Sequence, residues 1–220
     1  MGQKVHPYAF RLGPQYTWKS RWFATGNQYQ EFLHQDSQLR SMLMDRLRNA
    51  GIMDIEIERS LRRIVIRLFV TRPGVVIGRG GSGISELRKD IEKLLEIDSS
   101  SKQAIRVDLN VEEVKTPELS AWLMAQRISD QLARRIPHYR AANRIMDNVM
   151  NAGALGIKIV LSGRINGAAI GRTEKFSKGS VPRQTIKADI DFARLPAYTK
   201  SGFVGVKVWI HRPEAKETEI

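Results

Sequence analysis

The 220-residue sequence contains no cysteine, only four histidines and no long apolar run. Without cysteine the chain has no disulfide framework, no thiolate metal site and no cysteine nucleophile. The histidines do not have the spacing of zinc ligands; they are His6, His34, His138 and His211. No apolar stretch approaches the roughly 20 residues that span a bilayer, and the first residues do not lead into a signal-peptide core. These absences predict a cytoplasmic protein with no metal, no cofactor and no membrane partner.

Acidic residues are scarce in the second half of the chain. Overall, 36 lysines and arginines outnumber 23 acidic residues, which gives a net charge of +13 and a pI near 10.3. From Arg134 to Arg212, 15 basic side chains accompany only 4 acidic ones. Such an excess favours a polyanionic partner, typically a nucleic acid, over a protein that is basic without such a partner. We therefore expect most of the anion-binding surface in the C-terminal part.

The stretch VVIGRGGSGISEL, residues 75–87, contains two overlapping glycine motifs. Gly78, Gly80 and Gly83 form G-x-G-x-x-G, which is typical of dinucleotide-binding enzymes. That motif follows a buried strand, whereas only three residues separate a Pro-Gly pair from the first glycine here. The sequence therefore argues against a nucleotide-dependent oxidoreductase.

The same stretch contains G-x-x-G from Gly78 to Gly81, which is typical of the loop with which a KH module clamps single-stranded nucleic acid. Glycines remove Cβ atoms where the backbone must approach a sugar-phosphate chain, and Arg79 adds a charge. The following helix, with Ser82 as its expected cap, offers N–H groups and the positive end of its dipole. We expect an RNA-binding loop here; a glycine turn that only begins a structural helix is the alternative.

Periodicity predicts an α+β fold in two parts. In the first part we expect a helix over 28–49, strands in MDIEIE and RIVIRLFV, a short helix, the glycine loop, a helix over 83–97 and a strand in AIRVDLNVEEV. In the second part we expect helices over 116–136 and 139–151, then strands in GIKIVLSG, TIKADIDF and FVGVKVWIH. The second set favours two helices on one face of a small antiparallel sheet.

The predicted domain boundaries follow from these elements. Residues 1–25 are expected to form an extended N-terminal arm, because they follow neither the helical nor the strand period. Residues 26–112 are expected to form the first domain and 113–213 the second. A polar linker is predicted over 98–103 within the first domain, and residues 214–220 are predicted to form a tail.

Arginines gather at the end of the first C-terminal helix and on the second. Arg134 and Arg135 end the first helix, while Arg140 and Arg144 lie one turn apart on the second, opposite its apolar side. Only Asp147 interrupts this cationic side, and arginine can bind phosphate oxygens bidentately. We expect these four arginines to contact an RNA backbone rather than to form an ordinary solvated helix face.

Residues 163–184 are expected to form a long basic loop, since they contain four glycines and little apolar periodicity. One acid, Glu174, accompanies the cations Arg164, Arg172, Lys175, Lys178 and Arg183. A flexible surface loop would have this composition too, but a backbone that becomes ordered against RNA explains it better. Its contacts would be to phosphates and 2′-hydroxyls, so it would recognise shape more than base sequence.

The sequence offers no catalytic constellation. Asp189 and Asp191 share one face of a predicted strand, where a nuclease metal site is a remote alternative. Neither a histidine nor a second carboxylate pair accompanies them, and the nearby Lys187 gives them an ordinary charge partner. The sequence therefore predicts a protein that is not an enzyme.

A series of motifs resembles one family, the bacterial-type small-ribosomal-subunit protein S-three, or universal uS-three, family. The motifs occur in the family's order over nearly the whole chain: GQKVHP with RLG, RPGVVIGRGG, TPELSA, LGIKIVLSGRINGAAIGRTE, GSVPRQTIKADIDF and GVKVWI. A G-x-x-G loop by itself is only moderately specific, whereas the full series is highly specific. A free-standing KH-type regulator of messenger RNA is the alternative function from another class.

The resemblance implies a type II KH domain followed by the family's C-terminal α+β domain. It implies a structural constituent of the small ribosomal subunit that binds ribosomal RNA in the subunit head. Its expected neighbours are ribosomal proteins S-ten and S-fourteen, and with S-four and S-five it would help form the site where messenger RNA enters. The resemblance also implies that Lys4, Arg11 and the segment from Arg164 to Lys178 contact ribosomal RNA.

The chain departs from the pattern of bacterial relatives in two places, the KH loop and the second C-terminal helix. Those relatives usually have two basic residues inside the KH loop, where this chain has Arg79 and then Gly80. They also have three basic residues on the second C-terminal helix, credited with helping to unwind messenger RNA. The matching positions here are Tyr139, Arg140 and Asn143, of which only the arginine is charged.

Overall fold

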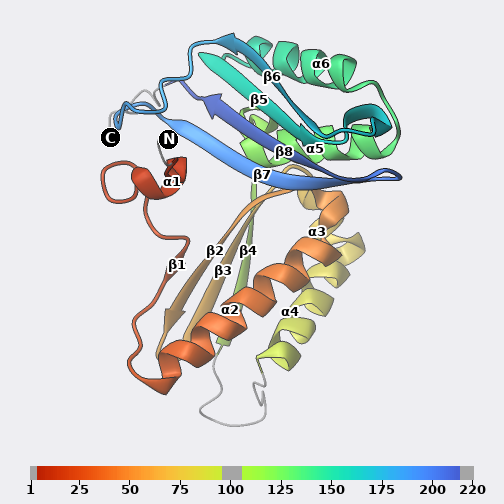
Figure 1. Ribbon diagram of the computed structural model, residues 1–220. Helices are drawn as coiled ribbons and strands as arrows, with labels where there is room; N and C mark the ends of the chain where they lie inside the picture. The colour runs from red at the N-terminus through yellow and green to blue at the C-terminus, as the bar shows by residue number, and fades with distance from the viewer. Residues whose placement is uncertain (1–3, 96–105, 214–220) are drawn as a thin grey trace. The chain divides into compact units, whose positions relative to one another are not determined.

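The computed structural model describes residues 4–95 and 106–213, drawn as the coloured ribbon in Figure 1. These residues divide into two compact units. The glycine-loop unit comprises the described residues between 18 and 115, and the C-terminal unit comprises 4–17 together with 116–213. No described helix is long and apolar enough to cross a membrane.

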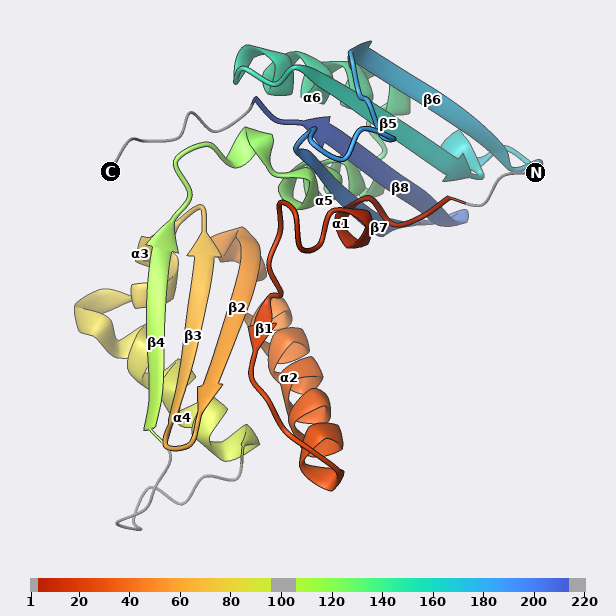
Figure 2. The ribbon, with the colours of Figure 1, turned by 90° about the vertical axis from the view of Figure 1, so that its left-hand side faces the viewer.

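The glycine-loop unit is a four-stranded sheet with helices on one face, as Figure 2 shows. Its elements are β1 (Ser20–Arg21), α2 (Asn27–Arg46), η1 (Arg48–Ala50), β2 (Ile52–Ser60), β3 (Arg63–Val70), α3 (Pro73–Ile77), η2 (Arg79–Gly81), α4 (Ser82–Leu94) and β4 (Arg106–Glu113). The sheet order is β1-β2-β3-β4; β2 and β3 are antiparallel, and β3 and β4 are parallel. The predicted order of a helix, two strands, a short helix, the glycine loop, a helix and a strand is confirmed.

Alternating side chains build the core of this unit. Every second residue is buried along β3, and on β2 the same alternation buries Ile55 and Ile57, as the period of two requires when one face of a sheet is covered. These side chains pack against leucines and isoleucines of α2 and α4 in one cluster, which includes Leu39, Leu43, Ile55, Ile57, Ile66, Leu68, Leu87 and Ile91. The predicted linker over 98–103 lies outside the described residues, and so does the predicted tail over 214–220.

The C-terminal unit has two helices on one face of an antiparallel sheet with the order β6-β5-β8-β7 (Figure 1). Its elements are α1 (Pro7–Phe10), η3 (Pro117–Leu119), α5 (Ala121–Ala133), α6 (His138–Asn151), β5 (Gly156–Gly163), η4 (Ile165–Gly167), β6 (Arg172–Gly179), β7 (Ile190–Thr199) and β8 (Gly202–His211). Helix α5 packs on β7 and β8, while α6 packs on β5 and β6. The predicted α+β class, with two helices against an antiparallel sheet, is confirmed.

The expectation of a long loop over 163–184 is wrong in its middle. Strand β6 lies within that segment and pairs with β5 along its full length, from Arg172 opposite Gly163 to Gly179 opposite Gly156. As the edge strand of the sheet, β6 has one neighbour and little apolar surface to bury, so it lacks the alternation that reveals inner strands. The second unit therefore has four strands where the sequence predicted three.

Two other boundaries differ from the predictions. The strand expected in TIKADIDF begins only at Ile190 and continues through Pro196, which an edge strand tolerates because one side of its backbone needs no partner. The helix expected from residue 116 is interrupted after Leu119, and α5 begins at Ala121. The side chain of Ser120 accepts a hydrogen bond from the Leu123 N–H, so Ser120 is the N-cap of α5.

Residues 4–17 do not form the extended arm predicted for this part of the chain. They contain the short helix α1, which packs on β7, and Arg11 is completely buried. The Arg11 guanidinium donates hydrogen bonds to four backbone carbonyls, those of Pro7, Arg183, Thr185 and Ala188, at 2.8 to 3.2 Å. A buried guanidinium must satisfy its donors, and here it does so by joining the N-terminal segment to the connection between β6 and β7.

Candidate nucleic-acid interface

The glycine loop joins two helices in a conformation that favours glycine. Helix α3 ends at Ile77, and Gly78, Gly80 and Gly81 have φ angles of +69°, +61° and +78°. The left-handed region is costly for residues with a Cβ atom. A Cβ at Gly80 or Gly81 would still meet no heavy atom within 4 Å, so the surface of the loop is open to a ligand.

Gly83 has a different role from the loop glycines. A Cβ at Gly83 would lie 2.5 Å from the carbonyl oxygen of Val76, so only glycine lets α4 approach α3 this closely. The third glycine of G-x-G-x-x-G is thus required by helix packing. The strand that precedes a dinucleotide-binding loop is replaced here by helix α3, and the dinucleotide interpretation fails for that reason.

The tip of the loop combines an exposed charge with a helix N-terminus that no side chain caps. The Arg79 side chain is exposed and makes no hydrogen bond or ion pair within the described part of the chain. Helix α4 begins at Ser82 with Gly81 as N-cap and no side-chain cap, so the expected capping by Ser82 does not occur. The Ser82 N–H donates to the Arg79 carbonyl, and no side chain caps the N–H groups that follow it, so the N-terminus of α4 can still attract an anion.

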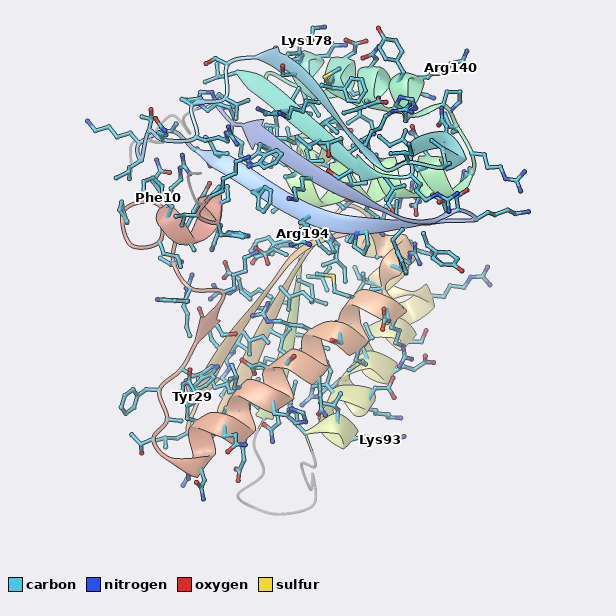
Figure 3. The ribbon with its side chains drawn as sticks, viewed as in Figure 1. Phe10, Tyr29, Lys93, Arg140, Lys178 and Arg194 are labelled. Atoms are coloured by element: carbon cyan, nitrogen blue, oxygen red, sulfur yellow. The ribbon has the colours of Figure 1, made fainter. Side chains whose placement is uncertain are left out.

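The four arginines predicted on the C-terminal helices are all exposed. Arg134 and Arg135 follow the end of α5, and Arg140 and Arg144 lie on α6 opposite its buried side, which consists of Ala141, Ala142, Ile145, Met146 and Val149. Arg140 and Arg144 line a shallow groove of about 480 Å³. The groove's one acid, Asp147, pairs at 2.8 Å with Lys178 of β6, and Figure 3 labels that lysine and Arg140. The acid is therefore neutralised within the protein, and the arginines of α6 have no partner of their own among the described residues.

A second hollow lies at one end of the same unit. This cavity of about 520 Å³ is lined by the end of α5, the turn before α6, the η4 segment and the β7–β8 hairpin. Its cations are Arg135, Arg164 and Lys200, and no acidic side chain lines it. Arg164 is held by hydrogen bonds to the carbonyls of Ala168 and Ser201, at 2.8 and 3.4 Å. Sequence reasoning missed Lys200, because the approach of this hairpin lysine to two arginines is visible only after folding.

The cations of the predicted basic loop are divided between the two faces of the sheet. Arg172 and Lys178 lie on the helix side of β6, and Lys175 lies on the opposite side. Arg172 pairs with Glu174 at 2.6 Å, and His138 of α6 contacts the same carboxylate at 2.7 Å. The hydrogen bond from Arg172, together with His138, lowers the pKa of Glu174 below its usual value. This pair is internal, so Arg172 is less available to RNA than Lys175.

The remaining predicted contacts have contrasting environments. Lys4 and Arg183 are exposed, and the Arg183 guanidinium lies 5.8 Å from the centre of the Trp209 ring. Arg11 is buried with its donors on carbonyl groups, so it has no surface to offer and belongs to the packing of the unit. The earlier expectation that Arg11 contacts RNA followed from the family motif, in which burial cannot be seen.

The two aspartates considered as a metal site have structural partners. Asp191 accepts hydrogen bonds from the Ala121 N–H at 2.8 Å and from Arg212 at 2.5 Å, and Asp189 accepts one from the Tyr16 hydroxyl. Burial and the Asp189 carboxylate raise the pKa of Tyr16. Across residues 4–95 and 106–213, no group of three or more histidine or acidic side chains could hold a metal ion.

Comparison with known proteins matches each of the two units to a different family of domains. Residues 38–119 match the family described as KH domain, and residues 128–210 match the family described as ribosomal protein S3, C-terminal domain. The curated relatives include small ribosomal subunit protein uS3 of Persephonella marina, 47% identical over 96% of this chain and 90% of that protein. The corresponding protein of Dictyoglomus turgidum is 45% identical over 99% of this chain and 86% of its own length. Together with the glycine loop between two helices and the antiparallel sheet behind α5 and α6, this similarity shows that the chain belongs to the uS3 family of small-ribosomal-subunit proteins.

Proposed function

We propose that this chain is a structural constituent of the small ribosomal subunit that binds ribosomal RNA in the subunit head and helps form the site where messenger RNA enters. The observation that carries the proposal is the row of arginines after the end of α5 and on α6. They have no ion-pair partner within the described part of the chain, and the neighbouring acid Asp147 is already neutralised by Lys178. Unpaired surface cations gain from releasing the counterions of a phosphate backbone. The protein catalyses no reaction in this role.

The two units would bind RNA in different ways. In the glycine-loop unit, Gly80 and Gly81 offer an open backbone next to the N-terminus of α4, which suits a close approach to one phosphate. In the C-terminal unit, Arg134, Arg140 and Arg144 offer separated charges that suit successive phosphates. Both modes contact the backbone, so we expect binding that depends on shape and salt more than on base sequence.

The contacts to messenger RNA would centre on the beginning of α6. Of the three positions at which bacterial relatives are basic, only Arg140 is charged here, and Tyr139 packs edge-on against Phe176 with the ring centres 6.0 Å apart. Arg135 and Arg144 lie near enough in sequence to supply the missing charge. The proposed partners on the same particle are ribosomal proteins S-ten and S-fourteen, with S-four and S-five near the site where messenger RNA enters.

Sedimentation of cell extracts tests this proposal directly. The chain should sediment with the small subunit and remain bound through a high-salt wash, because a constituent is held by many contacts at once. Omitting it from subunits assembled from purified parts should reduce messenger RNA binding. A chain that stays at the top of the gradient while binding messenger RNA would contradict the proposal and favour a free-standing regulator.

A further inference from the structure

The sheet of the C-terminal unit has a face that neither α5 nor α6 covers, called here the helix-free face. Helices α5 and α6 both lie on the other side, where Ala193, Ala197 and Val206 are buried. Because side chains alternate along a strand, the intervening residues of β5, β6, β7 and β8 point to the helix-free face. One end of this face is covered. There the connection between β6 and β7 lies over Trp209 through Val181 and Arg183, and the N-terminal segment with α1 packs on β7, with the centres of the His6 and Phe192 rings 4.9 Å apart.

The uncovered half of this helix-free face carries a row of cations. The pairing register places Lys175 of β6 opposite Val160 of β5, Val160 opposite Lys207 of β8, and Lys207 opposite Arg194 of β7. Lys175, Lys207 and Arg194 thus lie on one line across the sheet, with a total width of about 14 Å for three strand spacings. None of the three has an ion-pair partner among the described residues, and Figure 3 labels Arg194.

An exposed aromatic pair lies at the hairpin end of the same face. Tyr198 of β7 and Phe203 of β8 are opposite one another, with their ring centres 5.3 Å apart, and they are 71% and 66% exposed. Two adjacent exposed rings form a contiguous apolar patch, which is the kind of surface feature that marks an interaction site. They are four residues from the cation row along each strand, a distance of about 13 Å.

The space between the aromatic pair and the cations has a floor of small residues. The intervening row consists of Thr173, Ser162, Gly205 and Pro196, one from each strand. A Cβ at Gly205 would meet only the Ser162 carbonyl oxygen, at 3.6 Å, so this floor is not crowded. Nucleotides could therefore lie along the sheet without displacing side chains.

No strand position on the helix-free face is acidic among the described residues. Near the cation row, partial burial and the charges of Arg183, Lys175 and Lys4 lower the pKa of Lys158. This crowding of like charges is unfavourable in the isolated chain and would be relieved by an anion. The two acids of the sheet, Glu174 and Asp191, both lie on the helix side.

From this geometry we infer that the helix-free face is a second RNA-binding surface, which takes an unpaired segment by stacking bases on Tyr198 and Phe203 and holding phosphates on Lys175, Lys207 and Arg194. A four-stranded sheet with exposed aromatic rings is a recurring platform for single-stranded RNA, because every base has a flat face that can stack. The inference rests on the proposed function and adds the class of RNA bound and the residues that bind it.

A protein partner would be expected to present acids to the cations and an apolar patch to the rings. RNA satisfies both requirements at regular intervals with a single chain, and a flexible strand adapts to the flat floor at Gly205. RNA is therefore the occupant that fits this face, and binding of a protein partner there would overturn the inference.

Fluorescence anisotropy with the purified full-length chain tests the inference, using a 12-nucleotide oligouridine and an RNA duplex of equal length as probes. Tyr198→Leu with Phe203→Leu should weaken binding of the single strand about tenfold and leave the duplex almost unaffected. The triple variant Lys175→Gln, Lys207→Gln and Arg194→Gln should weaken binding of the single strand and flatten its salt slope by about 2. Ultraviolet crosslinks from the uridines should map to the peptide that contains Tyr198 and Phe203.

Gly205 provides a matched pair of variants. Gly205→Glu places a negative charge in the centre of the face without a backbone clash, whereas Gly205→Gln adds the same bulk without charge. The glutamate variant should bind the single strand several-fold more weakly than the glutamine variant at low salt, and the difference should shrink as salt rises. Equal affinities of the two variants would overturn the inference.

Other outcomes separate this inference from the proposed function. If the unmodified chain bound neither probe and did not enter subunits, the proposed function itself would fail. If it bound RNA and entered subunits while the aromatic and triple variants behaved as the parent does, only the inference would fail. Loss of a neighbouring ribosomal protein from subunits carrying the triple variant, with unchanged affinity for RNA, would likewise overturn it and identify the face as a protein contact.

Discussion

The two units differ in their ratio of basic to acidic side chains and in how many of these side chains are paired. Residues 18–115 contain 17 basic and 14 acidic side chains, and many of their arginines pair internally, among them Arg59 with the buried Asp36 at 2.5 Å. Residues 134–212 contain 15 basic and 4 acidic side chains, and arginines such as Arg140 and Arg144 have no ion-pair partner among the described residues. In the glycine-loop unit, the backbone conformation of one loop provides the binding feature. In the C-terminal unit, an excess of unpaired charge provides it.

This contrast shows that the basic residues of a protein fall into two groups, those paired within the fold and those left unpaired. Paired cations belong to the fold, since removing one leaves its partner unsatisfied. Unpaired cations are available to an outside anion, and they determine the salt dependence of binding. Arg11 and Arg140 illustrate the difference within one unit, because the first is buried among carbonyls and the second faces solvent.

The largest expected effect concerns the backbone of the glycine-loop unit. Gly83→Ala should lower the free energy of unfolding by about 3 kcal/mol, because the new Cβ would lie 2.5 Å from the Val76 carbonyl oxygen. Urea denaturation measures the loss. Gly81→Ala is the matched control, with open space around it and a cost of about 1 kcal/mol from its left-handed φ. Equal losses would show that crowding does not distinguish the two glycines.

Substitution of Arg11 tests whether a cation of the C-terminal unit can have a purely structural role. Arg11→Ala should lower the free energy of unfolding by about 2 to 3 kcal/mol, because four carbonyl groups lose their donor. Urea denaturation gives the magnitude, and Lys4→Ala should leave stability unchanged since Lys4 is exposed. At a temperature where the variant remains folded, its salt slope for RNA should equal that of the parent. A flatter slope would return Arg11 to the RNA surface.

Removing unpaired charge should change binding without changing folding. Arg140→Gln with Arg144→Gln should weaken RNA binding about equally for all sequences and flatten the salt slope by about 2. Titrations at several salt concentrations with two unrelated RNA sequences provide the measurement. Arg127→Gln is a suitable control on α5, because Arg127 is already paired with Glu118 at 3.5 Å. Loss of affinity for one sequence alone would contradict backbone binding.

A substitution in the glycine loop should separate binding from folding in the other unit. Gly81→Asp introduces a negative charge at an open position beside the N-terminus of α4, where the loop would meet phosphate. We expect several-fold weaker RNA binding with an intact fold, and Gly81→Asn as the neutral control should retain more of the affinity. Equal affinity of the aspartate and asparagine variants would remove the loop from the interface.

The smallest effect is a pH dependence within the C-terminal unit. The pKa of Glu174 is lowered in the folded state, so its ionised form contributes stability above the pKa of the unfolded chain, and this contribution disappears as pH falls through the folded value. Glu174→Gln should therefore reduce stability at neutral pH and make little difference in strong acid. Urea midpoints of both proteins between pH 7 and about pH 2 give the comparison. A constant difference over that range would contradict the assigned cause.

Much of the fold could be predicted because its inner strands and helices bury one regular side. The alternation of Ile55 with Ile57 and of Ile64 with Ile66 identified β2 and β3, and the apolar side of α6 identified that helix. Strand β6 escaped prediction because an edge strand with Phe176 as its one large apolar residue has no such pattern. Strand β6 is recognised by its backbone pairing with β5, which the local sequence does not reveal.

The parts of the candidate site that lie within one short stretch of sequence could be predicted. Gly78 to Gly81 and the arginines of α6 were found from spacing alone. The cation row on the helix-free face was missed because Lys175, Lys207 and Arg194 lie on three strands separated by long stretches of sequence. Their alignment depends on the register of the sheet, and a shift by one residue would turn each side chain to the other face.

The sequence by itself determined the uneven distribution of charge, the two-part α+β organisation and the conformation of the glycine loop, since these follow from composition, periodicity and the freedom of glycine. The tertiary structure alone decided which cations are free. Arg11 became internal and Lys207 external through contacts between distant segments, namely the hydrogen bonds to residues 183–188 and the pairing of β8 with its two neighbours. Burial and strand register are properties of the packed chain, and no single stretch of residues contains them.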